Sequence, residues 1–294
     1  MSLPQVYLVD ASVYIFRAWF SMPNEFTNTQ GEPTNAVYGF SGFLCSLLEQ
    51  TAAQHMAIAF DESLSSSYRN EIYPEYKANR EPAPEDLKRQ FQWARDVAQS
   101  MGLSCYSDPR YEADDVIGTL ADYWRDRGHP VCIVSSDKDL AQLISAGDCW
   151  WDFSRNQKLG TAQLLQKFGV LPEQMADYLA LTGDAVDNIP GVPGIGPKSA
   201  AALLAHFGDM DSMYERLDEV AFLSLRGAKS IHKKLQDHRP AAELARQLTL
   251  ICRDVASALA SPDIARGAVD TARLNRLFDE LQFGGMLRQR CLRA

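Results

Sequence analysis

This 294-residue sequence lacks closely spaced cysteines, long apolar runs and an excess of positive charge. The six cysteines show no close pairs, which argues against zinc knuckles and a disulfide framework. We interpret them as mostly buried small side chains in a reducing cytosol, and we expect a cytoplasmic protein. No apolar run reaches the ~20 residues of a membrane helix. Met1–Pro4 also lacks the basic region and apolar core of a signal peptide, so no membrane partner is expected.

Positive charge is scarce, since the formal net charge at pH 7 is −9, which is unusual for a protein that binds nucleic acid. Nine acids, however, fall into spaced groups, and without them the chain is formally neutral: Asp10, Asp61, Glu112, Asp114, Asp115, Asp137, Asp139, Asp184 and Asp187. The overall charge therefore does not exclude a phosphate substrate, because local charge decides. The five histidines show no metal-ligand spacing, and we assign them no role.

Three nearly continuous apolar runs each end in an acid: Gln5–Asp10, Met56–Asp61 and Val131–Asp137. Such runs are typical of strands that are buried on both faces of a parallel sheet. Helical patterns lie between them, so we predict an α/β fold. In such sheets ligands bind beyond the carboxyl ends of the strands. The three acids at these ends should therefore share one site.

Crowded carboxylates either bind metal ions or retain their protons, because like charges repel at short range. Oxygen ligands are hard donors and favour Mg²⁺ or Mn²⁺ over zinc. The nine acids together therefore suggest two-metal chemistry on a phosphoryl group.

Each later acidic group also has an explanation that needs no metal. Glu112, Asp114 and Asp115 open a predicted helix, where acids favour the helix dipole. Asp137 and Asp139 lie two apart, on one side of an extended segment, although Asp139 could simply start a helix over 140–144. Asp184 and Asp187 lie one helical turn apart and would then face the same way, or they could belong to a solvated turn.

Residues 62–90 form a long polar excursion from the predicted sheet, and a connection of this length is usually functional. Three basic residues alternate there with tyrosines, a mixture that suits base stacking beside phosphate contacts: Arg69, Lys77 and Arg80, with Tyr68, Tyr73 and Tyr76. The alternative is an ordinary solvated charged face.

From about residue 165 onward the sequence is helical in pattern, and it contains a glycine-rich stretch over 191–200. We predict two helices around a hairpin, with Pro197 at the first position of the second helix. Gly194 and Gly196 would let the backbone approach a ligand, and the amides that follow can hold a phosphate. A tight interhelical turn is the alternative. A second basic cluster lies beyond it, at Arg226, Lys229, Lys233 and Lys234.

Together these motifs resemble the bacterial 5′-nuclease family, which includes the 5′→3′ exonuclease domain of DNA polymerase I, phage 5′-nucleases and flap endonucleases. The resemblance runs from about Val6 to Val255 and is strongest over Glu112–Leu120, Asp137–Leu143 and Leu181–Ala200. It implies a nuclease core like that of PIN nucleases, a helical arch, and a helical SAM-like region with a helix-hairpin-helix.

The resemblance also implies roles for individual residues. Asp10, Asp61, Glu112, Asp114 and Asp115 would bind a first Mg²⁺ or Mn²⁺, and Asp137, Asp139, Asp184 and Asp187 a second. Lys77, with Arg80 and Arg17, would neutralise the scissile phosphate, and Tyr76 would stack on a base. The backbone of Val192 and Ile195 would hold K⁺. DNA contacts are expected at Arg69, Gly191, Gly194, Gly196, Lys198, Ser199, Arg226, Lys229 and Lys233.

We therefore expect a core over 1–165 with an arch at about 62–90, a helical DNA-binding region over 166–260, and a helical segment over 261–294 that packs on the core. The expected activity is structure-specific 5′→3′ exonuclease and flap endonuclease cleavage, by a monomer. The expected substrate is DNA with 5′ ends, flaps, nicks or gaps, with RNA–DNA hybrid as a further one, in replication or repair. The alternatives are a non-catalytic DNA-structure binder, a PIN-type ribonuclease and a phosphatase with an aspartyl nucleophile.

Overall fold

The fold is built on a six-stranded sheet whose strand order is β3-β2-β1-β4-β5-β6. The computed structural model describes residues 3–23, 25–62 and 67–294. All neighbouring strands run parallel except β6, which pairs antiparallel with β5. The strands are β1 (Val6–Asp10), β2 (His55–Ala59), β3 (Ser104–Tyr106), β4 (Val131–Val134), β5 (Cys149–Asp152) and β6 (Gln157–Leu159). The predicted α/β class is confirmed.

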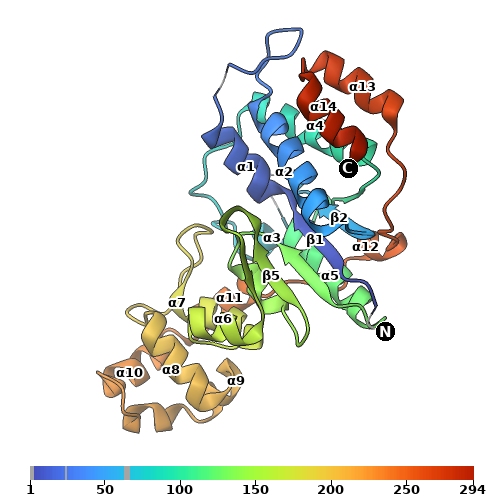
Figure 1. Cartoon of the computed structure of the whole chain (residues 1–294). Coiled ribbons are helices and arrows are strands. Elements are labelled where there is room, and N and C mark those ends of the chain that lie inside the picture. The colour runs from blue at the N-terminus through green and yellow to red at the C-terminus, as the bar shows by residue number, and fades with distance from the viewer. Residues whose placement is uncertain (1–2, 24, 63–66) are drawn as a thin grey trace.

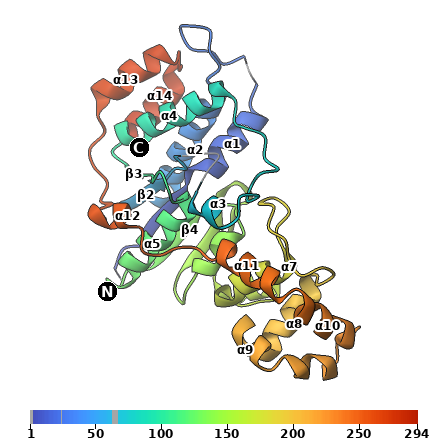
Figure 2. The same ribbon diagram turned by 180° about the vertical axis from the view of Figure 1, so that it is seen from behind.

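Helices cover both faces of this sheet, as Figures 1 and 2 show. The side chains of β1 alternate between two cores, with Val6 and Leu8 in one and Tyr7 and Val9 in the other, because successive side chains of a strand point to opposite faces. The first core includes side chains of α5 (Ala113–Arg125), η1 (Asp139–Leu143) and α12 (Ala256–Ala260). The second includes α1 (Ala11–Ser21), α2 (Asn35–Thr51), α4 (Glu85–Ser100), α13 (Thr271–Glu280) and α14 (Gly285–Arg293).

The middle of the chain forms a helical region below the sheet in Figure 1. It comprises α6 (Thr161–Phe168), η3 (Pro172–Gln174), α7 (Met175–Thr182), α8 (Pro197–Phe207), α9 (Met210–Glu215), η4 (Leu217–Phe222), α10 (Ala228–Asp237) and α11 (Arg239–Thr249), whereas η2 (Phe153–Arg155) joins β5 to β6. None of the helices in the described part of the chain is long and apolar enough to cross a membrane.

The segment that we expected to form an arch is anchored to the helical region along its described part. It contains α3 (Tyr68–Ile72), followed by turns and then an extended run before α4. The amide of Lys77 donates to the carbonyl of Asp187 at 2.9 Å, and the Asn79 side chain donates to Ala185 at 2.8 Å. Residues 63–66 of the expected arch lie outside the described residues. The segment thus brings Lys77 and Arg80 to Asp187, beyond α7.

Candidate active site

The carboxyl ends of the three central strands bring their acids together, as the apolar runs predicted. Asp10 ends β1, Asp61 follows β2, and Asp137 follows β4. Neighbouring serines orient two of them: Ser135 donates to Asp10 at 2.8 Å and Ser12 donates to Asp61 at 2.5 Å. A pocket of about 440 Å³ lies over these ends, and five carboxylates line it: Asp10, Asp61, Glu112, Asp114 and Asp137.

This pocket holds more negative charge than its own surroundings neutralise. Burial and the neighbouring Asp61 raise the pKa of Asp10 to about 7. Burial, then Asp137 and Asp10, raise the pKa of Asp114 well above its usual range. No described group donates a hydrogen bond to Asp114. Burial likewise raises the pKa of Asp137. Carboxylates in this state either hold protons or require cations among them.

The donor set fits divalent cations that prefer oxygen ligands. All the donors are carboxylates, and Asp139 has one buried oxygen, Oδ1, with no hydrogen-bond partner. Among the described residues, no three such donors already surround a single point. Three of the acids instead face basic side chains: Lys77 Nζ lies 2.7 Å from Glu112 Oε1, Lys138 Nζ lies 2.5 Å from Asp184 Oδ2, and Arg80 pairs with Asp187. These three acids are therefore paired with cationic side chains, whereas Asp10, Asp114 and Asp137 form no ion pair with a described residue.

Asp115 lies apart from the acids that line this pocket, and its surroundings argue against the predicted role as a metal ligand. Its side chain is fully buried, and both oxygens accept from the Arg69 guanidinium at 2.8 Å. The same oxygens also accept from the amides of Cys252 at 2.8 Å and Glu112 at 3.1 Å. A carboxylate with its lone pairs occupied in this way has none left for a cation.

The sequence had suggested that Arg69 contacts DNA, but its side chain is not accessible to DNA in the structure. Its side chain is 2 % exposed. Besides Asp115, it donates to the carbonyls of Leu248 at 2.8 Å and Leu250 at 3.2 Å. Arg69 therefore ties α3 to the start of α5 and to the end of α11, and it supports the site from within the protein.

Tyr76 was predicted to stack on a base, but its position in the structure does not suit that role. The side chain is 4 % exposed, so its ring offers no face to a base. The hydroxyl lies 3.1 Å from a carboxylate oxygen of Glu112 and 3.2 Å from one of Asp187. Burial and then Glu112 raise the pKa of Tyr76, so the hydroxyl keeps its proton as a donor. Tyr76 thus links the acids of the core to those of the helical region.

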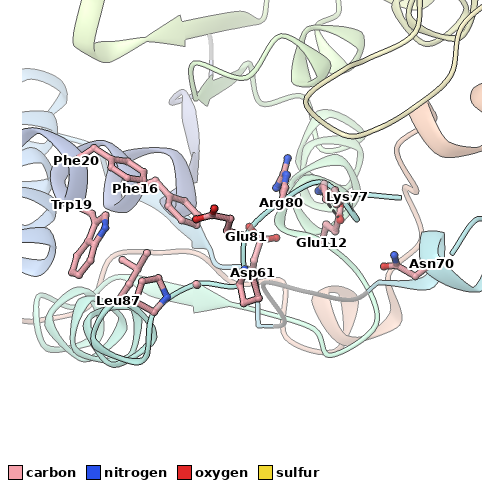
Figure 3. Close-up of a pocket in the computed structure, with 13 residues that line it drawn as sticks. Phe16, Trp19, Phe20, Asp61, Asn70, Lys77, Arg80, Glu81, Leu87 and Glu112 are labelled. Carbon is pink, nitrogen blue, oxygen red and sulfur yellow. Dashed lines mark hydrogen bonds and ion pairs between the residues drawn. The ribbon is translucent and has the colours of Figure 1, made fainter. Parts of the chain in front are cut away.

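Lys77 lies at the edge of this pocket, and its contact with a phosphate stays a prediction. Its ammonium group lies between Glu112, at 2.7 Å (Figure 3), and Asp187, at 3.7 Å. Burial alone would lower the pKa of Lys77, but Glu112 and Asp187 raise it, so the side chain stays charged. Its backbone has a φ of 57°, an uncommon conformation for a residue other than glycine. Lys77, Arg80 and Arg17 all line the same pocket as Asp10.

The second acidic group is less compact than the spacing suggested. Asp184 and Asp187 flank a turn rather than lie on a helix, because Asp184 Oδ1 accepts from the amides of Val186 at 2.7 Å and Asp187 at 3.3 Å. Their carboxylates therefore face different cations, Lys138 and Arg80, so the expectation that they face the same way is wrong. Asp139 begins η1, and its amide donates to Asp137 at 2.9 Å.

The glycine-rich hairpin forms between α7 and α8, with Pro197 at the predicted start of α8. A Cβ at Gly191 would collide with the backbone of Thr182 and Gly183, so the absence of a side chain at Gly191 serves internal packing. Gly194 has a φ of 76°, whereas Gly196 faces open space. Lys198 is exposed and Ser199 half-buried. Ile195 donates its amide to Val192 at 3.0 Å, and the K⁺ site at these two residues stays a prediction.

The second basic cluster presents free charge beside this hairpin. Arg226, Lys229 and Lys233 are exposed and form no ion pair with a described residue. Lys234 instead lies against the hairpin, where a Cβ at Gly194 would meet its ammonium group. Uncommitted basic side chains of this kind are what a phosphate backbone requires.

Three supporting residues escaped the sequence analysis: Ser12, Ser135 and Lys138. Ser135 donates to Asp10 and accepts from the amide of Asp137 at 2.9 Å, so it connects two strand ends. The only available signal was their position beside an acid at the end of a strand. A hydroxyl at such a position has many other possible partners, so the sequence did not single these residues out.

Two family models match consecutive parts of the chain. Residues 5–169 match the N-terminal resolvase-like domain of the 5′-3′ exonucleases. Residues 170–272 match the C-terminal SAM fold of the same proteins. The family resemblance drawn from the motifs is thereby confirmed.

Curated relatives are similar over nearly the whole chain. A 5′-3′ exonuclease of Aquifex aeolicus is 32 % identical over 289 residues, which cover 97 % of this chain and 94 % of that protein. The DNA polymerase I of Pseudomonas aeruginosa is 39 % identical over 288 residues, 98 % of this chain but 31 % of the polymerase. The chain thus spans about a third of the length of this polymerase relative, and 22 % of another, from Rhizobium leguminosarum.

Solved structures share the fold at low sequence identity. The T5 5′-exonuclease with bound zinc has a TM-score of 0.67 at 20 % identity and covers 94 % of this chain and 99 % of its own. The catalytic core of Rad2 in complex with a DNA substrate has a TM-score of 0.65 at 16 % identity and covers 99 % and 91 %. These likenesses confirm the predicted nuclease-type core and its attached helical region.

Proposed function

We propose that this chain, which belongs to the 5′-3′ exonuclease family, is a structure-specific nuclease that hydrolyses DNA phosphodiester bonds near 5′ ends with the help of divalent cations. One observation carries the proposal above the others. Five carboxylates line a single pocket at the ends of three neighbouring parallel strands, and burial and mutual repulsion raise the pKa of three of them: Asp10, Asp114 and Asp137.

The acids divide into two groups that could hold two cations. Asp10, Asp61, Glu112 and Asp114 would hold one, and Asp137 and Asp139, with Asp184 and Asp187, the other. We propose Mg²⁺ or Mn²⁺ because all the donors are carboxylate oxygens. Two such ions would supply an activated water and stabilise charge on the leaving 3′-oxygen.

The chain's own residues would position the phosphate. Lys77 and Arg80 lie at the pocket with their charges directed at its acids, and Arg17 lines the same pocket. Once cations neutralise the acids, these basic groups become free to contact the scissile phosphate, where they would stabilise charge in the transition state. The products would carry 5′-phosphate and 3′-hydroxyl ends.

DNA with 5′ ends, flaps, nicks or gaps is the substrate class that we propose, with RNA–DNA hybrid as a further substrate. The hairpin after α7 and the exposed Arg226, Lys229 and Lys233 support it, since such groups hold a phosphate backbone without reading bases. The Rad2 core that shares this fold is described in complex with a DNA substrate. We further propose K⁺ at the hairpin, action as a monomer, and a role in replication or repair in the cytoplasm.

The proposal is tested with an internally labelled 5′-flap duplex, incubated with Mg²⁺, with Mn²⁺ and with EDTA. Cleavage near the junction should require a divalent cation. Asp114→Asn should lower turnover at least about 100-fold, the cost typical of losing a group that stabilises the transition state. Asp86→Asn is the matched control, because Asp86 is an exposed acid in the first turn of α4 that lies outside the pocket.

Other outcomes would favour the alternatives. Tight, metal-independent binding of the flap duplex with no cleavage in either cation would make the chain a DNA-structure binder. Faster cleavage of single-stranded RNA than of the flap would indicate a ribonuclease instead.

A further inference from the structure

Two cysteines that are far apart in the sequence meet in the interior, away from the candidate active site. Cys45 lies on α2 and Cys291 on α14, and their sulfur atoms are 2.9 Å apart. Both side chains are fully buried. The sulfurs need to approach by less than about 1 Å to reach the bond length of a disulfide. The contact lies where α14 packs on α2, toward the opposite end of the molecule from α8 and α10 (Figure 1).

Contacts beside the two cysteines hold the helices in a fixed register. The Arg290 guanidinium donates to the two carboxylate oxygens of Glu49, at 2.9 and 2.8 Å, and to the hydroxyl of Ser46 at 2.9 Å. A bidentate pair of this kind fixes direction as well as distance. Leu287, one helical turn before Cys291, is buried on the same face of α14. The two sulfurs are therefore held face to face by their neighbours.

Packing alone would account for one buried cysteine, because a thiol behaves as a small apolar group. It does not require a second thiol at the same point. Cys105 shows the usual arrangement, since its thiol donates to the backbone carbonyls of Leu103 at 3.7 Å and Arg95 at 4.0 Å. Cys45 and Cys291 instead contact each other, which places two groups that can react together at one position.

The surroundings make Cys45 the thiol that reacts first. The Cys291 thiol donates to Cys45 and lowers the pKa of Cys45, and the nearby Arg290 lowers it further, against the opposing effect of burial. The same contact, together with burial, raises the pKa of Cys291. The thiolate is the form of cysteine that attacks an oxidant. Cys45 is therefore suited to the attack, and Cys291 to the second step that closes the bond.

Access to the sulfurs depends on α14. Leu287 and Cys291 are the buried residues of this nine-residue helix, so little apolar surface holds it in place. Elements of this kind open locally while the rest of the fold stays intact. A small oxidant therefore reaches the pair without unfolding of the whole chain. Without an oxidant the pair stays as two free thiols, as it is in the structure.

We propose that Cys45 and Cys291 form a reversible disulfide when the protein meets a peroxide, and that this bond locks α14 onto α2. The Cys45 thiolate attacks one oxygen of hydrogen peroxide, the O–O bond breaks, and the other oxygen takes a proton and leaves as water. The Cys291 thiolate then attacks the sulfenic sulfur of Cys45, the S–S bond forms, and the hydroxyl group takes a proton and leaves as a second water. The two sulfurs lose the two electrons that the peroxide gains.

The bond acts on stability rather than on the chemistry at the carboxylates. It connects positions 246 residues apart in the sequence. A cross-link stabilises a protein mainly by restricting the unfolded chain, and more so for a longer loop. Neither α2 nor α14 lines the carboxylate pocket, so cleavage below the melting temperature should be the same before and after oxidation. The inference therefore stands or falls independently of the proposed nuclease function.

The test treats the full, metal-free chain with hydrogen peroxide, alkylates the remaining thiols and maps the digested peptides by mass spectrometry. The expected product is a linked pair of peptides that carry Cys45 and Cys291 and that a reductant separates. The melting temperature should rise by roughly 5–15 °C, and dithiothreitol should reverse the rise.

Variants identify the residues responsible. Cys45→Ala and Cys291→Ala should each abolish the linked peptides and the rise in melting temperature. Cys105→Ala is the matched control and should keep both, because the thiol of Cys105 contacts backbone carbonyls. The melting temperature of each reduced variant shows whether it folds, and the peptide map of the wild type needs no variant.

Three results would overturn the inference. The first is unreacted thiols, or sulfinic or sulfonic acid at Cys45, with no linked peptides. The second is a link between Cys132 and Cys149, which are paired in register on β4 and β5, in place of the expected one. The third is the expected link with an unchanged melting temperature, which would show that the bond locks nothing.

Discussion

At the scale of single residues, the surroundings of a carboxylate decide its role. Asp114 and Asp115 are neighbours on the first turn of α5, yet they point to different environments. Asp114 lies among other acids with no described hydrogen-bond donor, whereas Asp115 is held by Arg69. The first has capacity for a cation, and the second is already neutralised. Two identical side chains in adjacent positions thus have different surroundings, one open to a cation and the other closed to it.

Arg69→Met should destabilise the folded protein strongly. It leaves the charge of Asp115 buried without its partner, which typically costs about 3–5 kcal/mol. Urea unfolding of the metal-free protein measures this loss. Arg110→Met is the control, because Arg110 and its partner Glu71 are both exposed, and its effect should be much smaller. Equal stabilities for the two variants would show that the Arg69–Asp115 pair does not hold the site together.

Lys77→Ala should act mainly on kcat. Its ammonium group is held between Glu112 and Asp187 before substrate arrives, so its contact with phosphate would matter most in the transition state. We expect a loss of about 100-fold in kcat, measured with saturating flap substrate. Lys88→Ala, on the exposed face of α4, should leave kcat unchanged. A change confined to KM would instead make Lys77 a docking residue.

At the scale of elements, the helix-hairpin-helix combines internal packing with an open face. Gly191 lets the hairpin approach the end of α7, and Lys234 packs on Gly194 from α10. Gly196 and Lys198, by contrast, face outward at the start of α8. The glycines of this motif therefore have different structural roles. Gly191 and Gly194 allow close packing inside the protein, whereas Gly196 lies against open space.

The double variant Lys229→Ala with Lys233→Ala should weaken binding of every DNA sequence to the same extent. Each lysine that contacts a phosphate releases counterions, so the slope of log K against log salt should fall by about 2 in magnitude. Fluorescence anisotropy over a range of KCl measures the slope. Arg276→Ala is the control, because Arg276 is exposed on α13, far from the hairpin in Figure 1. An unchanged slope would remove α10 from the DNA interface.

At the scale of the whole molecule, the site depends on both halves of the fold. One continuous apolar core contains Val6 and Leu8 of the sheet together with Leu204 and Leu235 of the helical region. The predicted metal-binding acids come from both parts of this core. Asp10 and Asp114 belong to the sheet and α5, while Asp184 and Asp187 follow α7. Formation of the acidic site is therefore coupled to folding of the whole chain, and a cation bound there should stabilise all of it.

Mg²⁺ should raise the melting temperature, and more at pH 8 than at pH 5. The pKa of Asp10 is raised to about 7 in the folded protein, so the metal-free fold binds extra protons and loses stability as pH rises from about 4 to about 7. Bound cations replace those protons. At 100 times Kd the gain is about 2.7 kcal/mol, or several degrees, by thermal scanning. Asp114→Asn should lose most of it. An equal gain at both pH values would contradict this coupling.

The sequence by itself determined the α/β class, the family, the acids at the strand ends and the hairpin with Pro197 at the start of α8. Each of these depends on local patterns, namely apolar runs, glycine spacing and the ends of strands, which constrain the backbone directly. Only the tertiary structure decided that Arg69 and Asp115 pair in the interior, that the ring of Tyr76 is covered, and that the thiols of Cys45 and Cys291 meet. These contacts depend on which distant segments approach one another in the folded chain. The sequence around a residue does not identify its long-range partner, so local patterns could not predict them.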